Sequence, residues 1–194
     1  GLTLSKWLET GKFHHTIKSM KDRASALPII KGVICTAPMN DIDIKKYCDL
    51  MEEIKRRTKV IDFFWKQDGH ALFKATTIES IALQIRKVLE LIAMSSLIAN
   101  KRLYASVYKD FSKAWNAEYL LRDLSRINPD YYPKAVVEEP CEEEGIKTHQ
   151  KDMEDGFLTK EDFVKIYKKC GAILHSENPY GRKISYHFYE KSIP

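Results

Sequence analysis

Residues 76–100 read TTIESIALQIRKVLELIAMSSLIAN, an apolar run long enough to set the architecture of the whole chain. Apolar residues recur in it at helical spacing and fill one wide face, made of Ile78, Ile81, Ala82, Ile85, Val88, Leu89, Ile92 and Ala93. Further apolar residues lie beyond that face, at Leu83, Leu91, Met94 and Leu97. A helix that is apolar on most sides is usually buried on most sides, so we predict a long, buried central helix here.

Polar residues mark the ends of this helix. The motif Thr76-x-x-Glu79 has the spacing of a capping box, in which the hydroxyl and the carboxylate each accept a hydrogen bond from a backbone N–H at the helix start. Lys101-Arg102 follows Asn100, where the helix dipole favours positive charge. Within the helix, Arg86 and Glu90 are four residues apart at the flank of the apolar face, a spacing that predicts an ion pair.

Further helices are predicted on both sides. We expect helices over residues 3–23, from Asn40 or Asp41 to about Trp65, over residues 109–127 up to Asn128-Pro129, and after the capping motif Thr159-x-x-Asp162. Residues 27–39 pair isoleucine and valine with flanking prolines, which indicates an extended segment. The predicted fold class is mainly α: a helical bundle of about five helices around a long apolar central helix, with an extended segment and an acidic loop. Residues 1–39 would form an N-terminal helix and extended strap and residues 40–194 a helical domain, together one continuous domain.

An acidic segment, residues 134–157, interrupts the helical pattern. Its glutamates are Glu138, Glu139, Glu142, Glu143 and Glu144. This composition predicts a mobile surface loop or a short hairpin. Carboxylates can bind a hard cation, but the sequence has no calcium-loop spacing, and its four cysteines are not spaced as zinc ligands. We therefore expect neither a metal nor another cofactor.

Charge and hydropathy narrow the expected partners. The 194 residues carry a formal net charge of +5, which suits a nucleic-acid surface and equally a solvated lysine-rich surface. The chain lacks the roughly 18 consecutive apolar residues of a membrane span, and no signal peptide precedes the first predicted helix. Cys48 and Cys170 fall within helical patterns and are expected to be reduced, small apolar residues. A cytoplasmic protein without a membrane partner is the resulting expectation.

The most unusual stretch is residues 175–182, HSENPYGR, which follows the last predicted helix. The dipole at a helix C-terminus favours a protonated His175. One interpretation is structural: Asn178-Pro179 ends the helix, and Gly181 permits a positive φ. The other interpretation is functional: His175 contacts or cleaves RNA, with Arg182 nearby.

Residues 182–187, RKISYH, fit the pattern R-x4-H with a polar residue after the arginine. Together with a helical domain built on a long apolar core helix, this pattern makes residues 40–194 resemble the HEPN superfamily, whose ribonuclease members carry R-x4-6-H. The resemblance implies metal-independent RNA cleavage, in which His187 is the general acid or base and Arg182 holds the phosphate. HEPN ribonucleases commonly place two such motifs across a dimer, so a homodimer is also implied. A second pairing, of Arg86 with His175, would require the two side chains to lie close together.

Two function classes remain open. The first is an RNA-directed component of a prokaryotic toxin or defence system, either a ribonuclease or an RNA-binding protein. The second is a non-catalytic helical protein-interaction or regulatory module, in which Arg86–Glu90 is a structural ion pair and the turn after residue 175 supports a protein interface. The expected partners are accordingly RNA, another protein and a second copy of the chain. The candidate catalytic residues are Arg182, His187 and His175, and the candidate binding residues are Arg86, Asn178 and Lys183.

Overall fold

The computed structural model describes residues 40–66, 69–108, 116–134, 136–140, 148–154, 156–176, 178–181, 183–186 and 189. This part of the chain is mainly helical, as predicted. Its helices are α3 (Asp41–Trp65), α4 (Lys74–Ala99), α5 (Lys101–Val107), α6 (Ala117–Ile127) and α7 (Lys160–Ile173), and its strands are β1 (Val136–Pro140) and β2 (Thr148–Asp152). The helix predicted over residues 3–23 and the extended segment predicted over residues 27–39 lie outside the described residues, as do Cys35 and Cys141.

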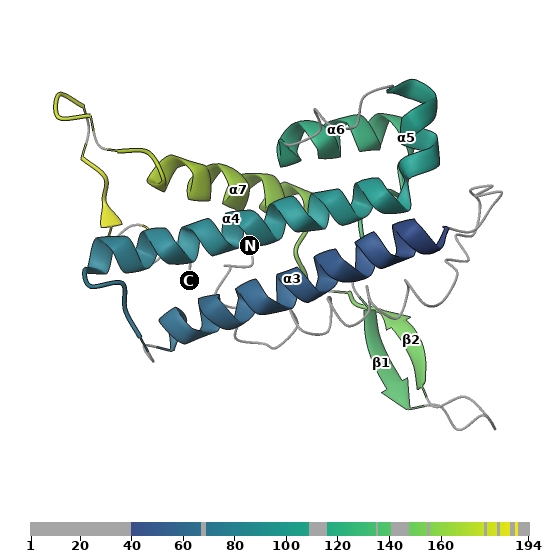
Figure 1. Cartoon of the computed structure of the whole chain (residues 1–194), viewed down its shortest axis with the longest axis horizontal. Helices are drawn as coiled ribbons and strands as arrows, with labels where there is room; N and C mark the ends of the chain where they lie inside the picture. Colours follow the sequence, from purple (N-terminus) through teal and green to yellow (C-terminus); the bar gives the residue numbers. More distant parts are fainter. Residues whose placement is uncertain are drawn as a thin grey trace.

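The two longest helices, α3 and α4, run antiparallel along the long axis of the molecule (Figure 1). α7 lies along the other side of α4, and α6 packs near the C-terminal end of α4. α4 contacts each of the other described helices. Its apolar residues point toward several neighbours at once, which explains why α4 buries more residues than a helix with a single apolar stripe would.

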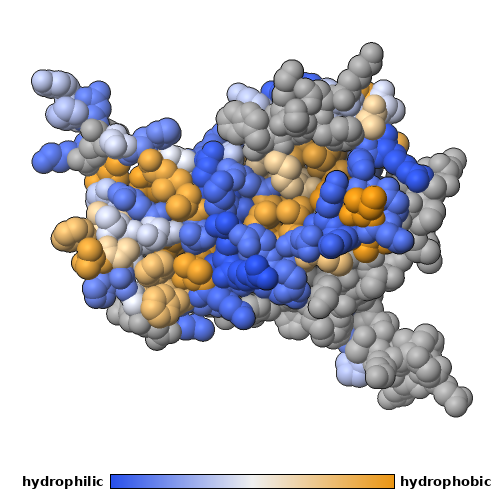
Figure 2. Space-filling model, viewed as in Figure 1, coloured by the Kyte–Doolittle hydropathy of each residue, from blue (hydrophilic) through white to orange (hydrophobic). Residues whose placement is uncertain are grey.

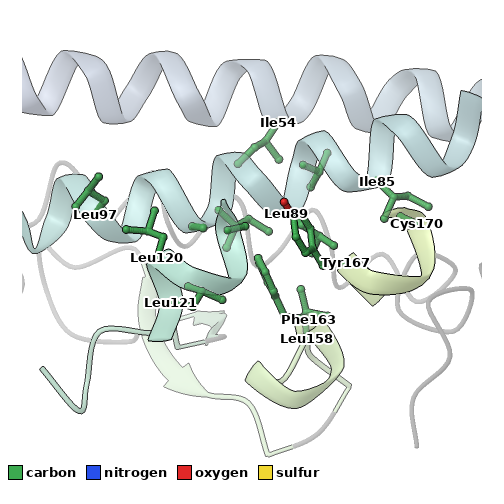
Figure 3. Close-up of a cluster of buried hydrophobic side chains, with 14 of the residues drawn as sticks. Ile54, Ile85, Leu89, Leu97, Leu120, Leu121, Leu158, Phe163, Tyr167 and Cys170 are labelled. Atoms are coloured by element: carbon green, nitrogen blue, oxygen red, sulfur yellow. The ribbon is translucent and has the colours of Figure 1, made fainter. Parts of the chain in front are cut away.

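The core lies on both sides of α4 (Figure 3). Ile54 of α3 approaches α4 from one side, and α6 and α7 approach from the other. The labelled core residues are Ile54, Ile85, Leu89, Leu97, Leu120, Leu121, Leu158, Phe163, Tyr167 and Cys170, all buried. Cys170 therefore occupies the small apolar position that its helical spacing predicted, and Cys48 is partly exposed.

Several helix ends agree with the sequence. The Asn40 side chain accepts a hydrogen bond of 2.8 Å from the Asp43 backbone N–H, and so caps α3. The Thr159 hydroxyl accepts from the Asp162 N–H at 3.1 Å and caps α7. Asn128 follows the last residue of α6 and ends it. These predictions are confirmed because each cap depends only on residues close in sequence.

The predicted start of the central helix is wrong. α4 begins at Lys74, two residues before Thr76, and Phe73 occupies the N-cap position. Thr76 is the third helical residue, and its hydroxyl accepts from the Phe73 N–H at 3.3 Å. Glu79 does not cap the helix; it accepts a hydrogen bond of 2.7 Å from the Tyr186 hydroxyl. The Glu79 carboxylate thus bonds to a residue far along the chain, and a local sequence motif cannot reveal such a partner.

The predicted end of the central helix is confirmed, because Asn100 is the C-cap of α4. The helix α5, which begins directly after Asn100, was not predicted. Lys101 pairs with the buried carboxylate of Asp43 in α3, with its Nζ 2.8 Å from each carboxylate oxygen. Asn128 donates from Nδ2 to Asn100 Oδ1 at 2.7 Å within the core. These long-range bonds hold the corner between α4 and α5 against α3 and the end of α6.

The acidic segment contains a hairpin. β1 and β2 pair antiparallel, with Val136 opposite Asp152 and Pro140 opposite Thr148. The hairpin projects away from the helices (Figure 1). Of the two predicted alternatives, the hairpin is therefore the one seen in the described residues, while residues 141–147 lie outside them.

Candidate functional site

Arg86 lies between α4 and α7. Its guanidinium carbon is 4.0 Å from the centre of the Tyr167 ring. Nη2 donates to the Tyr167 hydroxyl at 2.8 Å, and Nη1 donates to the Tyr167 carbonyl at 3.3 Å. Nε lies 3.4 Å from Glu90 Oε1, so the ion pair predicted from the sequence is confirmed. Each nitrogen of the guanidinium is thus engaged within the fold.

The surroundings of this cluster fix the arginine in place. A Cβ at position 171 would lie 2.6 Å from Arg86 Nη1, so glycine in α7 leaves the space that the guanidinium fills. Lys87 Nζ lies 3.1 Å from the second carboxylate oxygen of Glu90. Burial raises the pKa of the Tyr167 hydroxyl, while the nearby Arg86 charge acts in the opposite direction. The hydroxyl therefore stays protonated and can donate to Glu90 Oε1, 3.4 Å away. This geometry makes Arg86 a cross-link between two helices.

The other predicted site residues lie after α7. His175 is exposed, one residue beyond the C-cap Leu174, and the structure shows no hydrogen bond between it and Arg86 among the residues that it describes. Lys183 is exposed as well. Arg182 and His187, the two ends of the R-x4-H pattern, lie outside the described residues.

Asn178 shapes a turn. Its side chain accepts from the Tyr180 N–H at 3.0 Å, and its carbonyl accepts from the Gly181 N–H at 2.8 Å. The positive φ expected at Gly181 is not found; a Cβ there would instead lie 3.2 Å from Asn178 Cβ, so close approach is what favours glycine. The turn leaves Tyr180 97% exposed.

The middle of the R-x4-H segment is attached to the bundle. Tyr186 is half-buried and donates its hydroxyl to Glu79 of α4 at 2.7 Å. Ile184 and Tyr186 pack against the hydrophobic core. These contacts fix residues 183–186 near the start of α4.

A second feature, absent from the sequence predictions, is the turn between α3 and α4. The Phe73 N–H donates to the Ala71 carbonyl at 2.8 Å, and Leu72 between them has φ 65°. This i→i+2 bond around a positive φ is that of the rare, strained form of the γ-turn. Two threonine hydroxyls support it: Thr77 accepts from the Ala71 N–H at 2.9 Å, and Thr76 donates to the Ala71 and Phe73 carbonyls.

This turn holds two large apolar side chains in solvent. Leu72 is 81% exposed and Phe73 is 68% exposed. We call these two residues the apolar tip. Phe63 of α3 is also exposed, and its ring lies where a Cβ at Gly69 would be, 2.1 Å from that position.

His70 itself has the hydrogen-bonded role that its position favours. Its Nδ1 accepts from the Leu72 N–H at 3.2 Å, and the ring is exposed. One sequence signal pointed to the tip: Leu72 and Phe73 lie in a turn between Gly69 and the first turn of α4, with lysines at positions 66 and 74.

A shallow groove of about 250 Å³ lies between α6 and the start of α7. Two cationic side chains that line the groove make cation–π contacts. The charged group of Arg122 lies 4.8 Å from the centre of the Tyr119 ring, and that of Lys160 lies 5.1 Å from the centre of the Tyr131 ring. No residue predicted for the site lines this groove. Its lining residues are Glu118, Tyr119, Leu121, Arg122, Ser125, Tyr131, Lys160 and Val164.

Within the described part of the chain, no group of three or more histidine, cysteine or acidic side chains is placed to hold a metal ion. The described helices include none that is both long and apolar enough to cross a bilayer. In comparisons with known proteins, no family model, no curated protein and no solved structure matches this chain.

Proposed function

We propose that this chain is a non-catalytic helical interaction module that contacts its partner through the apolar tip. The observation that carries the proposal is the γ-turn, which keeps Leu72 and Phe73 in solvent. A non-glycine residue held in a sparsely populated positive-φ conformation costs about 1–3 kcal/mol, and Leu72 and Phe73 bury little apolar area in return. Such strain at an exposed position is a reason to look for a function there.

The rest of the structure supports the same proposal. Arg86 is engaged by Tyr167 and Glu90, which is the role that the module interpretation gives to it. We further propose that the helices form a HEPN-like bundle around α4, whose function is to hold the tip rigidly. The hydrogen bonds from Thr76 and Thr77 join the tip directly to the first turn of α4. A rigid display lowers the entropy that binding must overcome.

A photo-crosslinking experiment tests this proposal. A diazirine amino acid is placed at position 72 or, as a matched control, at Leu83, an exposed apolar residue further along α4. After irradiation of cells that contain the protein, mass spectrometry identifies protein and lipid adducts. We expect a discrete adduct from position 72 and none from position 83. Equal adducts from both positions, or none from position 72, would refute the proposed role of the tip.

A second candidate function is RNA-directed: a HEPN-like, metal-independent ribonuclease or RNA-binding protein of a prokaryotic toxin or defence system. The hydrogen bond from Tyr186 to Glu79 favours it, because this bond fixes the centre of the R-x4-H segment on the bundle. In this proposal the protein is a cytoplasmic homodimer, and two such segments meet across its two-fold axis.

The ribonuclease is tested with purified protein and total RNA in EDTA, beside the His187→Ala variant. His175→Ala and Arg182→Ala are assayed in parallel, since these residues complete the candidate site. Cleavage by the parent and none by His187→Ala is the expected result for this second candidate. Equal cleavage by both, or cleavage by neither, would exclude the R-x4-H mechanism and leave the interaction module.

A further inference from the structure

Two projecting turns lie at the same end of the bundle. The first is the connection between α3 and α4, with Leu72 and Phe73. The second is the turn after α7 that exposes Tyr180, and Tyr186 beyond it is bonded to Glu79 near the start of α4. Both segments lie at the left end of the molecule in Figure 1, and Figure 2 shows apolar surface at that end.

The exposed residues of this end combine apolar and cationic character. Leu72 and Phe73 are aliphatic and aromatic, and Tyr180 has an apolar ring with a polar hydroxyl. The exposed charged residues described in the two turns are lysines, at positions 66, 74 and 183, of which Lys74 also has a partner within the protein. Apolar side chains that enter the headgroup boundary, surrounded by lysines that meet anionic lipid, are the chemistry of interfacial membrane binding.

The size and shape of this end favour a lipid surface over a second protein. A stable protein interface uses roughly 20–30 residues on each side, far more than the few apolar and cationic side chains that the described residues of this end expose. The two turns lie at the same end of the molecule (Figure 1), where one flat partner can approach both. A bilayer needs no pocket of matching shape, because its headgroup region deforms around inserted side chains.

We propose that this end of the bundle docks peripherally on the surface of an anionic lipid bilayer, with Leu72, Phe73 and Tyr180 entering the headgroup layer. The inference rests on the proposed function, because it names the partner of the apolar tip. Peripheral docking needs no spanning helix, so it departs from the expectation of no membrane partner, which was based on the lack of a spanning segment and a signal peptide.

The test measures sedimentation of the full chain with phosphatidylcholine vesicles, with or without phosphatidylserine. We expect binding to the anionic vesicles, weaker binding at high salt because screening reduces the lysine contribution, and little binding to the neutral vesicles. The variant L72G/F73S should bind at least about tenfold more weakly, since it removes the inserted apolar area. Glycine tolerates the positive φ and serine suits an N-cap, so this variant keeps the turn.

Two further variants complete the test. Leu83→Ser removes an exposed apolar residue about 15 Å along α4 from Phe73 and should bind like the parent. K66Q/K183Q should weaken binding and lower its salt dependence. Binding that L72G/F73S leaves unchanged would overturn the inference, and so would a parent that does not bind. If the parent fails while position 72 crosslinks to a protein, the module stands and only the lipid inference is wrong.

Discussion

The substitution Gly171→Ala should have two opposing effects on stability: it raises the helix propensity of α7 and it disturbs the packing of Arg86. Alanine in a helix is more favourable than glycine by about 0.8–1 kcal/mol, so the substitution should by itself stabilise α7. The new Cβ, however, would lie 2.6 Å from Arg86 Nη1, and the guanidinium must move. Its bond to the Tyr167 hydroxyl is 2.8 Å long, and a hydrogen bond to a charged group contributes about 1.5–3 kcal/mol.

The interactions lost between Arg86 and Tyr167 outweigh the gain in helix propensity. Adding a cation–π contribution of about 0.5–1 kcal/mol from the Tyr167 ring, we expect Gly171→Ala to lower the free energy of unfolding by about 1–3 kcal/mol. In an Arg86→Met background the clash with the guanidinium is gone, and the same substitution should raise the free energy of unfolding by about 0.8–1 kcal/mol. The two effects have opposite signs, which corresponds to a coupling energy of about 2–4 kcal/mol.

Urea denaturation followed by circular dichroism measures the unfolding free energy of the four proteins in this double-mutant cycle. These are the parent, Gly171→Ala, Arg86→Met and the double variant. The slope of the unfolding free energy with urea should stay the same, which shows that stability and not compactness has changed. Arg57→Met serves as a control because Arg57 of α3 donates to Gln84 of α4 and pairs with Glu53 of its own helix, away from α7. Its effect should add to that of Gly171→Ala. If Gly171→Ala stabilises the protein equally with and without Arg86, the cluster does not cross-link α4 and α7.

Further predictions concern the core, the corner, the thiol and the hairpin. Leu89→Ala should lower the unfolding free energy by about 2–5 kcal/mol, measured by urea denaturation, because the side chain is buried. Asn128→Ala should cost about 1–3 kcal/mol in the same assay, since it leaves Asn100 Oδ1 unpaired in the core. Burial raises the pKa of Cys170 to about 12, so the parent should lose stability relative to Cys170→Ala as pH rises from about 8.5 toward that value; a parallel pH dependence would contradict this. Deleting residues 141–152 should shift Tm by less than about 4 °C, because β1 and β2 pair mainly with each other; a larger drop in a thermal melt would show that the hairpin supports the bundle.

The helices were predictable where their signals are local. The caps at Asn40 and Thr159 and the end of α6 at Asn128 each depend on residues within one helical turn. The apolar spacing of α4 likewise needs no knowledge of its neighbours. α5 gave no such signal, since it is a short helix whose Lys101 is fixed by Asp43, 58 residues earlier.

The start of α4 shows how a local motif can mislead. Thr76 and Glu79 have the spacing of a capping box, yet Glu79 accepts from Tyr186, 107 residues later in the chain. The hydroxyl of Thr76 serves the preceding turn as well as the helix. A motif fixes which bonds are possible, and the tertiary structure decides which of them form.

The apolar tip was missed for a different reason. Apolar residues beside a helix are assigned to the core by default, because most large apolar side chains of a domain are buried. For Leu72 the default fails, since a positive φ turns its side chain away from the bundle into solvent. Nothing in the residue type predicts this conformation, because leucine rarely adopts it.

In the Arg86 cluster, one contact was predictable from local spacing and the other was not. Its local half, the pairing with Glu90, followed from a spacing of four residues, while Tyr167 is 81 residues away and no spacing rule reaches it. One residue of the sequence, Gly171, nevertheless indicates the long-range contact between Arg86 and α7. Gly171 weakens α7 by its low helix propensity, and the guanidinium that fills the space above it explains why a larger residue would be unfavourable. A glycine inside a helix can thus indicate a long-range contact. The Gly171→Ala cycle measures whether the stabilisation from the Arg86 contact exceeds the helix propensity that glycine gives up relative to alanine.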